Sequence, residues 1–174
     1  MFSFQQNKKF YLAIGSTVIF ILYIVFVLQD ISNCFFIESE NNSLGLSFYY
    51  TKAIVLNFFE IRNQEQLACY SEFLKIWDIL FATIYTLMYA SWIAFFFKKI
   101  ILLIIPILAM IFDWAENYSE ILMLETYLNT GLISESLIRI GSGINSAKWI
   151  LFYLTYLLIL TGIILKIKNY FKKN

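Results

Sequence analysis

The fold is decided by residues 98–120, KKIILLIIPILAMIFDWAENYSE. Two lysines open this stretch, and residues 100–112 that follow them carry no charge. A membrane-spanning helix needs about 20 apolar residues, so this uncharged part is too short to cross a bilayer alone. To complete the crossing, the helix has to carry Asp113, and with it Glu116 and Asn117, into the outer part of the membrane.

The acidic end of this helix has a defined depth and a defined face. Counting from Lys99 places Asp113 roughly 21 Å, and Glu116 roughly 25 Å, along the helix from the lysines. Asp113, Glu116, Asn117 and Glu120 follow the i, i+3, i+4, i+7 spacing, which places them on one helix face. Charges at this depth are costly and normally face the protein interior. This face is therefore predicted to contact neighbouring helices.

The composition predicts that the whole chain is a membrane protein. Of its 174 residues, 60% are hydrophobic, 20% aromatic and only 14% charged, and the mean hydropathy is +0.71. Soluble domains are nearer half apolar and a quarter charged. We expect an all-α polytopic membrane protein, an antiparallel four-transmembrane-helix bundle in a single domain, residues 1–174. The spans are expected at about residues 10–28, 75–97, 99–119 and 147–166.

The segments between the spans also carry local signals. Two outer loops are expected, at residues 29–73 and 120–146. Apolar residues recur at helical spacing within residues 49–61, which predicts a short amphipathic helix on the outer side. A second short helix is expected at residues 134–140, with a glycine-rich turn at 141–143. Pro106, the only proline, lies mid-span and is predicted to kink the third helix.

The lysines predict the orientation in the membrane. Eight of them lie at one set of helix ends without any acidic residue: Lys8, Lys9, Lys98, Lys99, Lys166, Lys168, Lys172 and Lys173. The positive-inside rule then places both termini in the cytoplasm. We expect a bacterial inner membrane, with the mitochondrial inner membrane as the alternative. The basic residues suit contacts with membrane lipids, and nucleic-acid binding is not expected because they form no groove.

Two cysteines, Cys34 and Cys69, lie in the first outer loop. In an oxidising compartment they could form a disulfide that staples this loop. Two unrelated thiols are the alternative, which the spacing leaves open. The sequence has no histidine and no C-x-x-C motif, so we expect neither a metal site nor a cofactor.

Five polar residues from three helices are predicted to meet at one depth: Asp78, Asp113, Glu116, Asn117 and Lys148. One interpretation is a buried salt-bridge and amide network that clamps the helices, since buried carboxylates have to be paired. The other is a polar pocket, open to the outer side, for a ligand, a lipid headgroup or a proton. Three carboxylates against one lysine leave an excess of negative charge, which favours a proton on one of them.

The order of these residues resembles a known family. Tyr70, Asp78 and Tyr85, then Pro106, then the run Asp113-Trp-Ala-Glu116-Asn117, then Lys148-Trp149, are similar to small bacterial four-helix inner-membrane proteins. Those proteins carry a D-x-x-E-N motif at the end of helix 3 and a lysine at the start of helix 4. The resemblance covers roughly residues 50–165. It implies the topology and the polar cluster, and no activity is established for that family.

The sequence carries no nucleophile–base pair and no nucleotide-binding loop, so no catalytic residue is assigned. The leading hypothesis is a non-enzymatic protein that binds a protein partner, or forms a homo-oligomer, as an accessory subunit of a membrane assembly. One alternative is a lipid- or ligand-binding protein, or an isomerase-like enzyme, that uses the outer carboxylates. Another is a proton-coupled transporter, although four helices without an internal repeat do not favour it.

Overall fold

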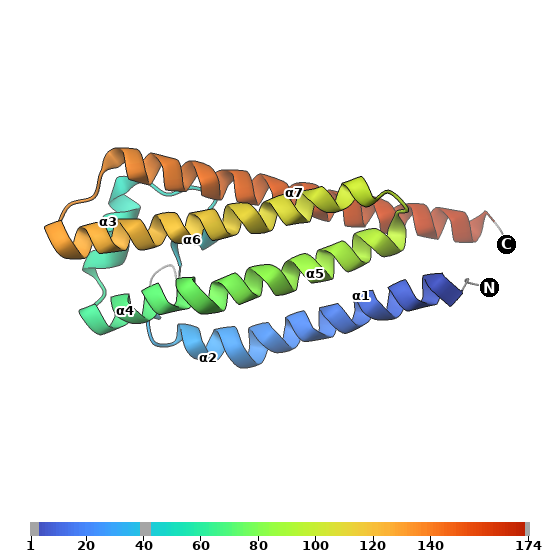
Figure 1. The fold of residues 1–174 in the computed structure, drawn as a ribbon, viewed down its shortest axis with the longest axis horizontal. Coiled ribbons are helices and arrows are strands. Elements are labelled where there is room, and N and C mark those ends of the chain that lie inside the picture. The colour runs from blue at the N-terminus through green and yellow to red at the C-terminus, as the bar shows by residue number, and fades with distance from the viewer. Residues whose placement is uncertain (1–3, 39–42, 173–174) are drawn as a thin grey trace.

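The computed structural model of the chain describes residues 4–38 and 43–172. In this part of the chain, four helical segments are long and apolar enough to cross a membrane: Asn7–Ser32, Gln64–Phe96, Ile100–Thr130 and Glu135–Phe171. Figure 1 shows them side by side, with successive segments running in opposite directions. The prediction of an all-α, four-span antiparallel bundle is confirmed. Lys173, which was counted with the orienting lysines, lies outside the described residues.

The four segments contain short changes of helix type. The elements are α1 (Phe4–Tyr23), η1 (Ile24–Leu28), α2 (Gln29–Ser32), η2 (Leu44–Leu46), α3 (Lys52–Glu60), α4 (Gln64–Glu72), η3 (Phe73–Trp77), α5 (Asp78–Phe96), η4 (Ile100–Leu103), α6 (Ile104–Thr130) and α7 (Glu135–Phe171). A π-helical turn, η1, joins α1 to α2, and another, η3, joins α4 to α5. Each span is therefore continuous in direction, although its hydrogen-bonding pattern changes locally.

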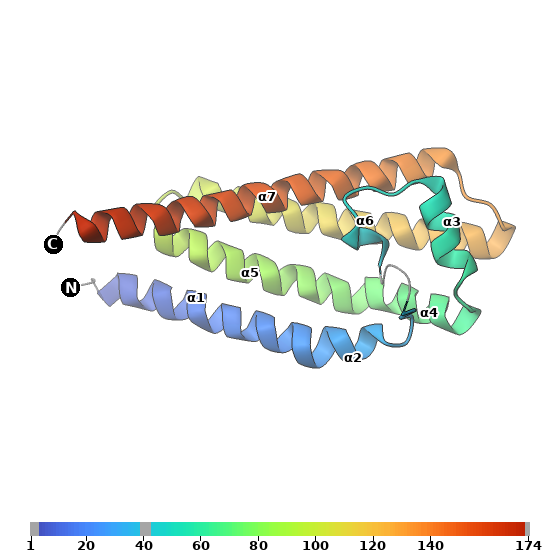
Figure 2. The same ribbon diagram turned by 180° about the vertical axis from the view of Figure 1, so that it is seen from behind.

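The helices do not contribute equally to the bundle. The most extensive packing is between α6 and α7, and α5 packs against both of them. The first helix, α1, packs mainly along α5 and lies at the edge of the bundle in both views (Figures 1 and 2). The N- and C-terminal ends and the α5–α6 turn lie at one end, and the segment 43–62 covers the other.

Two apolar clusters stabilise the bundle at different depths. The outer cluster includes Phe58, Phe59 and Tyr70, and it packs the segment around α3 onto α4 and α6. The inner cluster includes Tyr85 and Phe152, and it lies between α5, α6 and α7. Tyr70 and Tyr85 each donate a hydrogen bond to an acidic side chain of α6. The acidic face of α6 is therefore enclosed between the two clusters.

The expected amphipathic helix of the first outer loop is α3. Thr51 caps its N-terminus by accepting a hydrogen bond from the Ile54 amide at 3.4 Å, as cap residues do. Its buried residues are Val55, Phe58 and Phe59. These apolar side chains anchor α3 across the outer end of the bundle.

The second outer loop differs from the prediction. Residues 134–140 are not a separate helix, and 141–143 do not form a turn, because α7 runs without a break from Glu135 to Phe171. The connection from α6 is the short segment around Gly131, whose φ of 69° requires a residue without a side chain. Gly141 serves packing instead, because a Cβ there would lie 2.6 Å from the Tyr50 hydroxyl.

The prediction for Pro106 was also wrong in its position within the helix. Residues 100–103 form a 3-10 turn, and α6 begins only at Ile104. Pro106 therefore lies in the first turn of α6, where its missing N–H has no carbonyl to bond within the helix. Pro106 thus lies near the start of α6 and not in its middle, and the kink stays a prediction.

Candidate functional site

The polar cluster is built around the single acidic face of α6. Asp113, Glu116, Asn117 and Glu120 lie on this face and are all buried, as their spacing predicts. Lys148 reaches them from α7 and is itself 5% exposed. The antiparallel packing of α6 and α7 brings these side chains to the same level.

Lys148 forms a clamp between α6, α7 and the outer segment. Its Nζ donates to Asp113 Oδ1 at 3.1 Å and also to Glu116 Oε2. A third hydrogen bond goes to the Gly45 carbonyl oxygen at 3.3 Å. The Trp149 indole donates to the same carbonyl at 3.1 Å. The three ammonium hydrogens thus have three acceptors, and the predicted buried salt bridge is confirmed.

Asp78 joins the cluster through an amide rather than through the lysine. Asn117 Nδ2 donates to Asp78 Oδ2 at 2.8 Å and approaches the Leu74 carbonyl oxygen at 3.4 Å. Asp78 is half-buried at the start of α5. The structure therefore brings all five predicted residues together, with Asn117 linking α5 to the clamp on α6 and α7.

Three residues complete the cluster that were not among the predicted site residues. Tyr85 on α5 donates to Asp113 Oδ2 at 2.8 Å, and Tyr70 on α4 donates to Glu120 Oε2. Glu120 is fully buried. Its spacing on the acidic face was a usable signal. Of the 12 tyrosines in the sequence, Tyr70 and Tyr85 were singled out only by the family resemblance, which gave them no role at the acids.

Protein-family models, curated proteins and solved structures were compared with the chain, and none matched.

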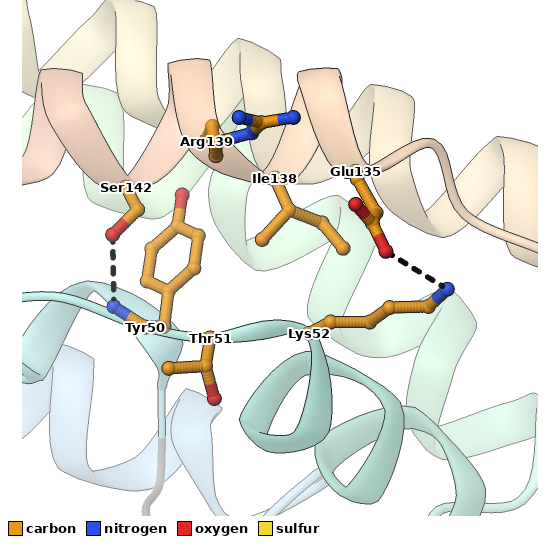
Figure 3. A pocket seen from close by; sticks show the side chains of 7 residues that line it. All are labelled: Tyr50, Thr51, Lys52, Glu135, Ile138, Arg139 and Ser142. Carbon is orange, nitrogen blue, oxygen red and sulfur yellow. Dashed lines mark hydrogen bonds and ion pairs between the residues drawn. The ribbon is translucent and has the colours of Figure 1, made fainter.

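A pocket of about 460 Å³ lies beyond the cluster, between the start of α3 and the outer part of α7 (Figure 3). It is lined by Tyr50, Thr51, Lys52, Glu135, Ile138, Arg139 and Ser142. Lys52 pairs with Glu135 at 3.9 Å across it, and the Tyr50 amide donates to Ser142 Oγ at 3.0 Å. None of the five predicted site residues lines this pocket.

Tyr50 connects this pocket to the buried cluster. Its ring lines the pocket and points toward α7 in Figure 3. Its hydroxyl is buried and has no hydrogen-bond partner within the described part of the chain. Burial, and then the nearby Glu120 and Glu116 carboxyl groups, raise the pKa of Tyr50. The phenol therefore keeps its proton at physiological pH and faces the acids as a neutral donor.

Cys34 and Cys69 are bonded as a disulfide, with a Cα–Cα distance of 6.3 Å. The bond joins the segment after α2 to α4, so it ties the edge helix to the rest of the bundle. Phe35, next to the first cysteine, is buried in the outer cluster. The disulfide therefore closes a loop whose first residues are already held by packing.

Removal of this disulfide is expected to destabilise the outer end of the bundle. The cysteines are 35 residues apart, and closing a loop of that length stabilises a fold by about 3–4 kcal/mol through the unfolded-state entropy. The Cys34→Ser, Cys69→Ser double variant should show this loss in an unfolding titration in detergent. Reduction of the wild-type protein should give the same loss, and reduction of the double variant should give none. An unchanged midpoint in both would contradict the prediction.

Proposed function

We propose that this chain is a non-enzymatic accessory subunit that binds a protein partner within the membrane. The observation that carries the proposal is the side of α1 turned away from α5, which stays exposed in the described part of the chain. Ala13 is the one buried residue among the described side chains of the first span. The contacts of α1 with η3 and α5 run along one side of the helix. On that side Thr17 accepts a hydrogen bond from the Trp92 indole at 2.9 Å, and Tyr23 donates to the Trp77 carbonyl.

The opposite side of α1 carries a notch suited to a second helix. Gly15 lies there, between Tyr11 and Val18 at helical spacing, and a Cβ at Gly15 would meet no atom within 4 Å. A glycine in a helix costs about 1 kcal/mol relative to alanine, and packing within this chain gives no reason for it. Small residues let transmembrane helices approach closely, which supports a partner helix in this position.

The Gly15→Leu substitution is expected to abolish partner binding without changing the fold. The leucine would fill the notch on the outer face of α1, where it meets nothing in this chain. Tagged wild-type and variant proteins are extracted into a gentle detergent from their native membrane, and the co-purifying proteins are identified. Recovery of a defined partner should fall at least tenfold in the variant, while the thermal midpoint stays within a few degrees.

The matched control for this experiment is Gly162→Leu. A Cβ at Gly162 would lie 2.5 Å from the Phe96 ring, so that variant should lose stability within the bundle itself. A monodisperse single chain in the wild type, with no partner for Gly15→Leu to release, would refute the proposal. A different outcome is a single chain that retains a small molecule in native mass spectrometry and loses it in Arg139→Met. Ligand binding in the pocket of Figure 3 would then take the place of partner binding as the proposed function.

The membrane and the orientation form part of the same proposal. Lys98 and Lys99 lie in the turn between α5 and α6, at the end of the bundle where the two chain termini also lie. Positive charge at that end supports a cytoplasmic location for it, and the disulfide at the other end supports an oxidising compartment there. A bacterial inner membrane would fit the positive charge at one end of the bundle and the disulfide at the other. Membership in the small four-helix family with the D-x-x-E-N motif belongs to the same proposal.

A further inference from the structure

The buried cluster carries more negative charge than its lysine balances. Among the described residues, Lys148 is surrounded by four acidic side chains, those of Asp78, Asp113, Glu116 and Glu120. An uncompensated charge inside a protein is unstable by several kcal/mol, and such groups take up a counter-charge or become neutral. The cluster therefore needs a further positive charge, a proton or a cation, in addition to Lys148.

The hydrogen bonds show where the additional positive charge is required. Glu116 uses Oε2 to accept from Lys148, and Glu120 uses Oε2 to accept from Tyr70. Their other oxygens, both Oε1, are buried and have no donor in the described structure. The two carboxyl groups lie one helical turn apart on the same buried face of α6, where side chains at i and i+4 are neighbours. Two carboxylates cannot bond to each other, because both only accept, unless a proton lies between them.

A second observation is independent of the acids. The Tyr50 hydroxyl is unpartnered in a side chain that is 2% exposed. It lies beside Ser119 and Met123, on the turns of α6 that flank Glu120. Buried hydroxyls are nearly always hydrogen-bonded. Asn145 Oδ1, on the neighbouring turn of α7, is likewise buried without a donor among the described residues. Two buried polar atoms outside α6 thus also lack a hydrogen-bond partner in the described structure.

We propose that Glu116 and Glu120 form a proton-binding carboxyl pair that exchanges with the outer side of the membrane. In the loaded state Glu120 carries the proton and donates it through Oε1 to the ionised Glu116. Loading takes one proton from a hydronium ion, releases one water, and removes one negative charge from the cluster. The charged and titratable groups facing the pair from the elements around it are Tyr50, Tyr70, Asp78, Asp113 and Lys148.

A chain of hydrogen bonds runs from Glu120 of the pair to the half-buried Ser43. The half-buried Ser43 hydroxyl lies 3.2 Å from the Tyr70 hydroxyl, which in turn donates to Glu120. Tyr70 can pass its proton to Glu120 Oε2 and accept one from Ser43, which takes one from the hydronium ion, so both hydroxyls end unchanged. Rotation of the neutral Glu120 carboxyl group then turns the proton toward Glu116. A proton is favoured over a metal ion, because no three acidic or cysteine side chains in the described chain are arranged to hold one.

Infrared spectroscopy of the full-length protein in detergent tests the proposal directly. Exposed glutamates are ionised at neutral pH, so a carbonyl stretch from a protonated glutamate should come only from this pair. The wild type should show that band at neutral pH. The band should shift in protein labelled with ¹³C-glutamate and in D₂O. The label separates the pair from Asp78 and Asp113, which it leaves unshifted.

The variants locate the proton. Glu120→Gln should remove the glutamate band, because its amide N–H replaces the shared proton, while Glu125→Gln, at an exposed glutamate on the same helix, should leave it intact. Absence of a glutamate band in the wild type overturns the proposal whether or not Glu120→Gln folds. A thermal midpoint that rises with sodium chloride but not with choline chloride, and only when Glu120 is present, also overturns it, because a metal cation would then hold the pair together.

Discussion

Replacement of Lys148 by methionine is expected to lower the free energy of unfolding by about 3–5 kcal/mol. Methionine preserves most of the volume, so the loss is electrostatic. Asp113 Oδ1, Glu116 Oε2 and the Gly45 carbonyl oxygen would all lose their shared donor. The acids would then be buried without any cation among the described residues around them. The measurement is the midpoint of an unfolding titration in mixed detergent micelles, with helicity as the readout.

A rescue experiment separates the clamp from general loss of packing. In the background of Lys148→Met, the changes Asp113→Asn and Glu116→Gln neutralise the two acids that Lys148 pairs with directly. They should recover most of the stability, because neither side chain then needs a cation. Lys75→Met is the matched control. Lys75 forms an exposed ion pair with Glu125 at 3.7 Å, and such pairs contribute about 0–1 kcal/mol. Equal losses in both lysine variants, or no rescue, would contradict the clamp.

The clamp was predictable because it follows from a shortage of apolar residues. Residues 100–112 are too few to span a bilayer, so Asp113 and Glu116 have to enter the membrane and pair with a basic side chain there. Lys148 is the basic residue at that level of the last helix, and the structure pairs it with both acids. Hydropathy and the cost of burying charge are properties of the sequence alone, which is why this part of the site could be derived from it.

The rest of the site depends on tertiary packing, which the sequence does not reveal. Tyr70 and Tyr85 are functional neighbours of the acids only because α4, α5 and α6 pack face to face. Gly141 was interpreted as a turn residue, since glycine commonly ends helices. Its actual role is to let Tyr50 approach α7. A glycine that breaks a helix and a glycine that allows close packing look the same in a single sequence.

The position of the cluster helps to explain why a clamp is needed there. The inner apolar cluster around Tyr85 and Phe152 lies within the lipid-spanning part, where neighbouring lipid is as apolar as the helices and burial drives little association. The outer cluster around Phe58 and Tyr70 holds the segment that covers the bundle. Lys148 lies between the two and contacts both the α6 helix and the covering segment. It therefore couples the outer segment to the spans.

Replacement of Arg62 by methionine is expected to destabilise the outer segment by roughly 2–4 kcal/mol, because two buried carbonyl groups would lose a charged donor. Arg62 is only 4% exposed. Its Nε donates to the Phe35 carbonyl oxygen at 3.0 Å, and its Nη1 donates to the Phe58 carbonyl oxygen at 2.8 Å. The guanidinium also lies 3.6 Å from the centre of the Phe58 ring. It thereby joins the residue that follows the first disulfide cysteine to the end of α3.

The effect of Arg62→Met should be local, because these contacts belong to the outer cluster and not to the spans. Amide hydrogen exchange should accelerate in residues 43–62 and remain slow in the α6–α7 pair. Arg62→Lys should recover little of the stability that Arg62→Met loses, since an ammonium group cannot reproduce the two-pronged geometry of a guanidinium. Arg139→Met, at an exposed arginine on α7, should change stability by no more than about 0.5 kcal/mol. Uniform acceleration across the spans would show instead that the outer segment and the bundle unfold as one unit.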